Sequence, residues 1–365
     1  MDEQKYDIQG LDEYIRQSEP PKRERGKAWQ VAIGLQQVDG LTPSSYLIDT
    51  ARQHIDGEIS ISEAKKLIDS YYQSAKNRSE IEEDRTEEAD KVSARIAEIL
   101  SEKTFNFSPA QLTSIHRRLF EGIYKYAGRI RNYNITKKEW VLNGESIYYA
   151  DYETISETLE YDMRTEREFS YAGVPIDDAI RHLMRFCANL WQIHPFCEGN
   201  TRTTAVFMIK YLRTLGFNVV NDVFAHNSWY FRNALVRANY SNLQQGITET
   251  TIYLERLFRN MLLGEEYTFL NRELHIDWNK HAEEKSQIQS ANSALKTLPK
   301  CKNCTLEEIA VLRVVNENPN ATQKEIASAI GKSERTVKTI TINLQEKGIL
   351  KRAGGKRNGK WEIVS

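Results

Sequence analysis

The sequence lacks any apolar run of about 18 residues, so we expect no segment that spans a membrane. Its opening, MDEQKYDIQG, is neither the basic nor the apolar part of a signal peptide, and we expect a cytoplasmic protein. Charge is nearly balanced, with 50 Lys and Arg against 51 Asp and Glu, so no strong overall field selects a partner.

Cysteine is also scarce. The four cysteines, at 187, 197, 301 and 304, form no disulfide framework, which fits a reducing compartment. Cys301 and Cys304 have the spacing of metal ligands, but no second pair accompanies them. We therefore favour an exposed turn with two free thiols over a metal site.

The 365 residues suggest two or three domains of mainly α structure. We expect an N-terminal helical region over 1–65, a helical catalytic region over 66–270 and a linker over 271–304. Apolar residues at 61, 64, 67, 68 and 71 recur at helical spacing after a capping box, SISE. Residues 131–151, RNYNITKKEWVLNGESIYYAD, alternate around Asn143-Gly144 and predict a short β-hairpin.

The last region, 305–365, has the pattern of a winged helix-turn-helix. A helix, a short helix over 323–330, a turn at Gly331 and a helix over 333–347 precede two strands around a basic loop. From residue 332 onward nine basic residues face three acidic ones, which favours DNA. The recognition helix offers few base-reading side chains, so a module for protein contacts or dimerisation is the alternative. The expected phosphate contacts are Lys332, Arg335, Lys338, Lys356 and Arg357.

The stretch HPFCEGNTRTT, residues 194–204, places polar chemistry between two apolar helical segments. Pro195 disfavours helical geometry at His194, so the first helix should end there and the next should begin near Thr201. The first amides of that second helix lack intrahelical partners and carry the positive end of its dipole. With Gly199 allowing close approach and Asn200 and Arg202 donating, the loop predicts a phosphate site.

Glu198 would repel a phosphate unless Mg²⁺ lay between them, held by the carboxylate and the phosphate oxygens. His194 faces the same loop, where an imidazole with a pKa near 7 would accept a proton from an attacking hydroxyl. These parts predict transfer of a phosphate-containing group to a hydroxyl. The alternative is a buried turn whose polar groups satisfy one another, and five such residues in nine positions argue against it.

HPFCEGNTR resembles the signature of the Fic family, H-x-F-x-(D/E)-G-N-x-R, and LTSIHRRLFEGIYKYAGRIRNYNI resembles the family's stretch leading into its flap. The resemblance covers roughly residues 80–265. It implies a Fic-type helical bundle with a β-hairpin flap that moves AMP from ATP to a Ser, Thr or Tyr hydroxyl of a target protein, releasing pyrophosphate. The flap, around Lys137 to Tyr148, would align the target segment by strand addition.

Carried over from the family, His194 would be the general base, Phe196 a core anchor and Glu198 the Mg²⁺ ligand. Gly199 and Asn200 would bind the α-phosphate, Thr201 would belong to the nucleotide-binding residues, and Arg202 would reach further along the triphosphate. Tyr230 and Asn233 resemble residues that line the adenosine pocket, with a packed core helix as the equal alternative. Two positions depart from the pattern: Thr201 replaces a glycine, and Ala205 replaces a second arginine that grips the γ-phosphate.

Family members often carry an inhibitory glutamate in an (S/T)-x-x-x-E-(G/N) motif. The match here is SEIEED, with Ser79 and with Glu82 or Glu83 as the glutamate, and a solvated helix start is the alternative. The segment 60–72 resembles a small antitoxin-like inhibitory module.

We expect ATP and a hydroxyl-bearing protein as partners, DNA through the last module, and no membrane. A homodimer is left open. Two other functions also stay open: a nucleotide-sensing DNA-binding regulator and a Fic-fold phosphotransferase.

Overall fold

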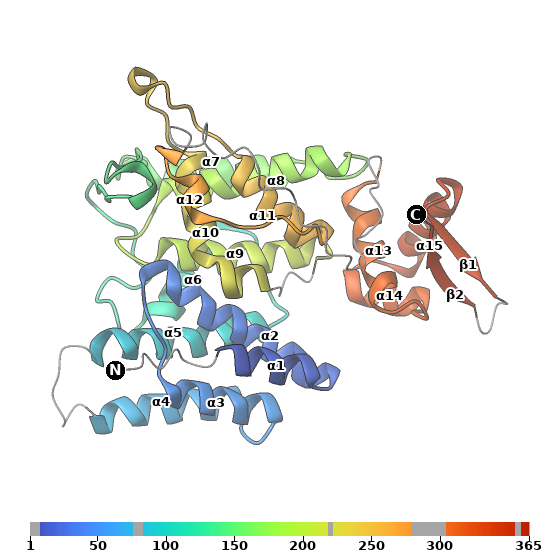
Figure 1. Ribbon diagram of the computed structural model, residues 1–365, viewed down its shortest axis with the longest axis horizontal. Helices are drawn as coiled ribbons and strands as arrows, with labels where there is room; N and C mark the ends of the chain where they lie inside the picture. Colours follow the sequence, from blue (N-terminus) through green and yellow to red (C-terminus); the bar gives the residue numbers. More distant parts are fainter. Residues whose placement is uncertain (1–7, 76–82, 218–221, 279–303, 355–358, 365) are drawn as a thin grey trace.

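The computed structural model describes residues 8–75, 83–217, 222–278, 304–354 and 359–364. These residues are mainly helical, as predicted, and Figure 1 shows the helices gathered into one large body with a smaller body at the C-terminal end. Among the described helices, none is long and apolar enough to cross a bilayer.

Five N-terminal helices pack together beside the region that follows them (Figure 1). Buried Asp90 joins three of them, because its carboxylate accepts from the amide of Ser44 at 2.9 Å and from the hydroxyl of Tyr72 at 2.7 Å. The predicted capping box is present, with Ser60 and Glu63 each accepting from the other's amide. The boundary expected at residue 65 falls inside the fourth helix. The elements are α1 (Ile8–Gln17), α2 (Pro20–Gly34), η1 (Leu35–Asp39), α3 (Ser45–Asp56), α4 (Ile61–Ala75) and α5 (Glu83–Ser101).

The central helices follow the apolar stripes of the sequence. On the eighth helix the apolar positions recur every three or four residues and are buried, which fixes the face that packs on its neighbours. The ninth helix is buried on almost every side, so it runs through the middle of the core. The elements are α6 (Pro109–Phe120), η2 (Trp140–Leu142), α7 (Ile155–Glu168), α8 (Ile176–Ile193), α9 (Asn200–Thr214), α10 (Asp222–Ala238), η3 (Leu243–Gln245), α11 (Ile252–Leu263) and α12 (Asn271–Leu274).

The segment 131–150, here called the flap loop, turns where the sequence predicts but forms no strands. Asn143 and Gly144 have φ values of 56° and 86°, as the turn requires. The amides of Glu139 and Gly144 bond to carbonyls across the turn, at 2.9 Å each. Beyond them the two arms are held by other contacts, including Lys137 N to Ser146 Oγ at 3.2 Å. The predicted β-hairpin is therefore wrong as a strand pair, because side chains and the core hold the arms instead of a ladder.

The C-terminal module is a winged helix, as predicted, and it packs against the central helices (Figure 1). Arg313 donates to the carbonyl of Met261 at 2.7 Å, and the amide of Ile176 donates to the carbonyl of Cys304 at 2.9 Å. The elements are α13 (Leu306–Glu317), α14 (Gln323–Ile330), α15 (Glu334–Glu346), β1 (Leu350–Ala353) and β2 (Lys360–Ile363), with the two strands antiparallel.

The expectation for the cysteine pair is wrong at Cys304, which is fully buried and disulfide-bonded rather than a free thiol in an exposed turn. Cys301 lies outside the described residues. In the described part of the chain, no three His, Cys, Asp or Glu side chains gather to hold a metal ion.

Candidate functional site

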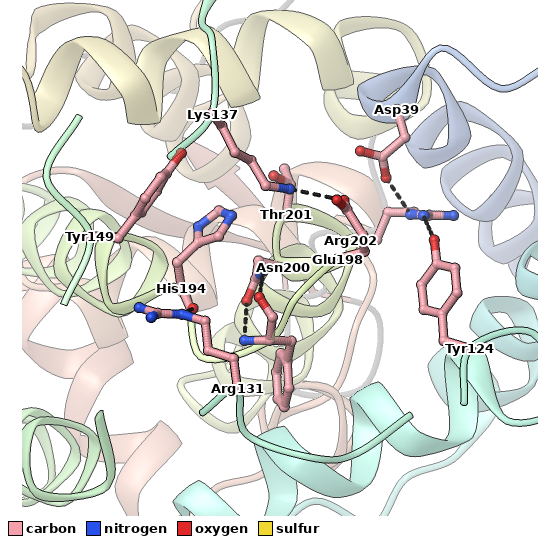
Figure 2. Close-up of polar contacts among 12 residues, drawn as sticks. Asp39, Tyr124, Arg131, Lys137, Tyr149, His194, Glu198, Asn200, Thr201 and Arg202 are labelled. Carbon is pink, nitrogen blue, oxygen red and sulfur yellow. Dashed lines mark hydrogen bonds and ion pairs between the residues drawn. The ribbon is translucent and has the colours of Figure 1, made fainter. Parts of the chain in front are cut away.

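The junction of α8 and α9 has the predicted geometry. Helix α8 ends at Ile193, one residue before His194, whose φ of 48° turns the chain out of the helix ahead of Pro195. Gly199, with φ of 75°, is the N-cap from which α9 begins at Asn200. The intervening loop brings His194 and Glu198 to the N-terminal end of α9 (Figure 2).

His194 is held in the form that a base needs. Its Nδ1 lies 3.1 Å from the carbonyl oxygen of Trp191, so Nδ1 carries the proton and Nε2 is left as the acceptor. The ring packs against the ring of Tyr149, with centroids 4.2 Å apart. Burial, with the nearby charge of Lys137, holds the pKa of His194 well below its ordinary value rather than near 7 as expected. The imidazole is therefore neutral at physiological pH.

The N-terminal end of α9 is an uncapped row of donors. No side chain caps the helix at Gly199, and within the described residues nothing accepts from the amides of Asn200, Thr201 or Arg202. Free amides at the positive end of a 15-residue helix attract an anion. This is the backbone cradle that the sequence predicts.

The side chains of Asn200 and Thr201 serve the loop itself. Asn200 accepts from the amide of Phe196 at 3.0 Å and donates to its carbonyl at 2.7 Å, so its amide is not turned toward a ligand as expected. Thr201 accepts from the indole of Trp191 at 2.9 Å. A Cβ at Gly199 would lie 2.4 Å from the ring of Phe120, so packing as well as backbone geometry requires glycine there. The alternative of mutually satisfied polar groups thus holds for these side chains but not for the amides of α9.

Glu198 lies at the mouth of the site. Its side chain is half exposed, and its Oε2 lies 2.9 Å from the ammonium of Lys137 on the flap loop (Figure 2). In the described part of the chain its Oε1 has no partner. One accessible carboxylate beside a phosphate cradle is the ligand set that Mg²⁺ takes when nucleotide phosphates supply the rest. The residues present therefore fit the expected ion.

Arg202 is fully buried and surrounded by acceptors. Its Nη2 lies 2.6 Å from Glu88 Oε1, its Nε 2.7 Å from Asp39 Oδ2 and its Nη1 3.0 Å from Gln36 Oε1. The guanidinium also stacks over Phe120, 4.8 Å from the ring centroid. Figure 2 shows Asp39 approaching it from the N-terminal helices. Here the arginine that we expected along a triphosphate fastens η1 and α5 to α9.

The loop rests on a second histidine that the sequence analysis did not single out. His116 lies 3.0 Å from the carbonyl of Glu198 through Nε2 and accepts from the amide of Gly128 at 2.8 Å through Nδ1. Its ring stacks on Phe196, with centroids 3.7 Å apart, and burial lowers its pKa to about 4. Phe196 is buried, as the core anchor should be. In the sequence, this histidine could have been found from its place in IHRRLF, within the stretch that resembles the family's segment before the flap.

Arg131 ties the flap loop to the same junction. Its side chain donates to the carbonyls of His194 at 2.8 Å and Tyr133 at 2.7 Å. The carbonyl of Ala150 accepts from its other guanidinium nitrogen. The loop and the helix junction therefore form one connected unit.

The two residues expected at an adenosine pocket lie on α10 and are buried. Tyr230 packs on Phe269, with ring centroids 4.6 Å apart, and Asn233 donates to Asn271 at 2.8 Å. Among the described residues neither makes a polar contact with the loop 194–199. Their packing fits the core-helix interpretation, and their part in binding stays a prediction. It is Arg232, on the same helix, that reaches the flap loop, 3.0 Å from buried Glu139.

The expected inhibitory residues fall at the edge of what the structure describes. Ser79 and Glu82 lie outside the described residues, and Glu83 is the first residue of α5. The carboxylates found on Arg202 are instead Glu88 and Asp39, and no local motif marks either.

Of the five expected phosphate contacts in the winged helix, Arg335 and Lys338 are exposed on α15. The ammonium of Lys332 is 2.7 Å from Glu307, and both side chains are about a third exposed, so its contact with phosphate stays a prediction. Lys356 and Arg357 lie outside the described residues.

Comparisons with known proteins agree with both parts of this arrangement. Residues 106–212 match the profile of the Fic/DOC family, and residues 308–351 match a winged helix-turn-helix DNA-binding profile. The protein adenylyltransferase VbhT of Bartonella schoenbuchensis is 23% identical over 153 residues, which is 40% of this chain and 30% of that protein. The probable protein adenylyltransferase y4lH of Sinorhizobium fredii is 30% identical over 129 residues, which is 34% of this chain and 62% of that protein.

The match therefore spans less than two thirds of either relative. Among solved structures, the N-terminal Fic domain of a Bartonella effector protein from Bartonella sp. AR 15-3 is 20% identical, with a TM-score of 0.36 over 48% of this chain and 82% of that one. Taken with the motif at 194–202, the profile matches show that this chain contains a Fic/DOC family domain, of the kind present in proteins named adenylyltransferases, followed by a C-terminal winged helix-turn-helix domain.

Proposed function

We propose that the protein is an adenylyltransferase that transfers AMP from ATP to a Ser, Thr or Tyr hydroxyl of a protein. The observation that carries this is the position of a neutral, proton-accepting His194 beside the free amides of α9. A base next to an anion cradle is the arrangement that attack of a hydroxyl on a phosphate requires. The relatives' names support AMP as the transferred group.

In the proposed reaction the target oxygen bonds to the α-phosphorus of ATP as the bond from that phosphorus to the bridging oxygen breaks. Nε2 of His194 takes the proton of the hydroxyl, and pyrophosphate leaves. The amides of Asn200, Thr201 and Arg202 hold phosphate oxygens and stabilise the charge that develops on them. Mg²⁺, held by Glu198, would neutralise charge on the phosphates when bound.

The direct experiment is incubation of the full chain with Mg²⁺ and ATP labelled at either the α or the γ phosphate. Label moving from the α position onto protein supports adenylylation. Movement of γ label alone would instead support a phosphotransferase and would reject the proposal.

One observation favours a second candidate, the nucleotide-sensing regulator. Helix α8 contacts the winged-helix module at Ile176 and leads at its other end into His194. A conformational change at the nucleotide site could therefore be transmitted along α8 to the winged-helix module. Bound nucleotide that changes DNA affinity without any transfer of label would favour this function.

A further inference from the structure

Among the described residues, neither arginine position of the motif, 202 or 205, supplies a free guanidinium to the proposed nucleotide site. Position 205, where related motifs carry a second arginine, is a buried alanine, and each guanidinium nitrogen of Arg202 lies within 3.0 Å of a protein oxygen. Withdrawing Arg202 would leave the carboxylates of Glu88 and Asp39 without their cation in a largely buried place, which is strongly unfavourable. A polyphosphate therefore needs another cation.

Lys137 of the flap loop is placed to be that cation. Its ammonium lies 2.9 Å from Glu198 Oε2 and has no other partner in the described part of the chain. In Figure 2 its side chain extends from the flap loop to Glu198, which lies just before the first turn of α9. Its backbone is anchored, because its amide donates to Ser146 and the flap loop is tied down by Arg131.

The ion pair between Lys137 and Glu198 is easy to exchange. The carboxylate is half exposed and the lysine is about a quarter exposed, and exposed pairs contribute little to stability. Glu198 is also the expected ligand of the metal that accompanies a nucleotide. When Glu198 turns to that role, the ammonium is left beside the amide cradle.

We infer that Lys137 is the side-chain cation that binds a nucleotide phosphate in this site, taking the part expected of Arg202. The inference rests on the proposed nucleotide site but not on which phosphoryl group is transferred. It assigns to the flap loop a role in holding the nucleotide, in addition to the expected role in aligning the target.

The test compares Lys137→Gln with Lys138→Gln in the full chain. Lys138 is the exposed neighbour on the same loop, with no ion pair among the described residues, so it controls for the loss of one charge. Binding of ATP and of adenosine is measured by titration calorimetry, with Mg²⁺ and again in EDTA. A charged hydrogen bond to phosphate predicts that Lys137→Gln weakens ATP binding by about tenfold or more and leaves adenosine binding unchanged. Lys138→Gln should stay within about twofold, and Lys137→Arg should restore ATP affinity.

Equal ATP affinity for Lys137→Gln and wild type would overturn the inference. So would an equal loss for adenosine, which would place the effect in the fold, or a loss seen only in EDTA, which would show that Lys137 does not bind phosphate once Mg²⁺ engages Glu198. If wild type binds no nucleotide, both the inference and the proposed function fail. If the ATP-specific loss appears but no label is transferred, the phosphate role of Lys137 stands and only the proposed function fails.

Discussion

The Nη2 atom of Arg202 on α9 lies 2.6 Å from the Oε1 atom of Glu88 on α5. The two residues are 114 positions apart in the sequence. Arg202, a residue of the family motif, therefore links the N-terminal helices to α9, whose first amides form the proposed phosphate cradle.

Replacing Glu88 with alanine should therefore destabilise the fold. The change leaves a fully buried guanidinium with one fewer carboxylate, and losing a partner of a buried ion pair costs about 3 kcal/mol. The free energy of unfolding from urea titrations measures the effect. Glu87→Ala is the comparison on the same helix: it also removes a carboxylate, but its cation Lys91 keeps Asp69 as a partner, so it should cost less than Glu88→Ala. Equal losses for the two variants would contradict a fastening role for Arg202.

His116 predicts a pH dependence of stability. Burial lowers its folded pKa to about 4 from 6.5, so between these values the unfolded chain binds a proton that the folded chain does not. The contribution of the neutral ring is thus complete above pH 6.5 and is lost as the pH falls toward 4. The stability gap between wild type and His116→Gln should narrow by about 2 kcal/mol from pH 7.5 to pH 5.0. A gap that stays constant or widens on acidification would show that the histidine is not held neutral.

The winged helix predicts DNA binding through the exposed face of α15. Arg335→Gln combined with Lys338→Gln should weaken binding of duplex DNA and lower the slope of log affinity against log salt by about 2, because each lost phosphate contact removes about 0.9. Lys332→Gln should change the slope less, since Glu307 already pairs with that lysine. An unchanged slope in the double variant would assign the module to protein contacts.

The parts of this structure that the sequence could predict are those with a local signal. Pro195 and Gly199 mark the end of α8 and the start of α9, because each restricts or frees the backbone where it stands. The helices of the winged helix can also be predicted locally, because capping boxes begin two of them at Thr305 and Thr322 and a glycine at 331 ends the second.

The remaining features depend on residues that only the fold brings together. Arg202 meets Asp39 and Glu88 across more than a hundred positions, and nothing near any of the three indicates the pairing. The flap loop keeps an alternating pattern, yet Arg131 and the core hold its arms, so pattern alone gives the wrong element. The side-chain amide of Asn200 could bond either to a ligand or to its own loop, and the loop geometry places it on the backbone of Phe196.

The measurement that tests the account most directly is the rate at which α-labelled ATP modifies protein, compared between wild type and His194→Ala at equal protein concentration. Circular dichroism and urea titration confirm that both chains are folded. The account predicts label on protein with wild type and a loss of at least about a hundredfold in the variant, the contribution expected of a general base. Transfer by His194→Ala at the wild-type rate would contradict it.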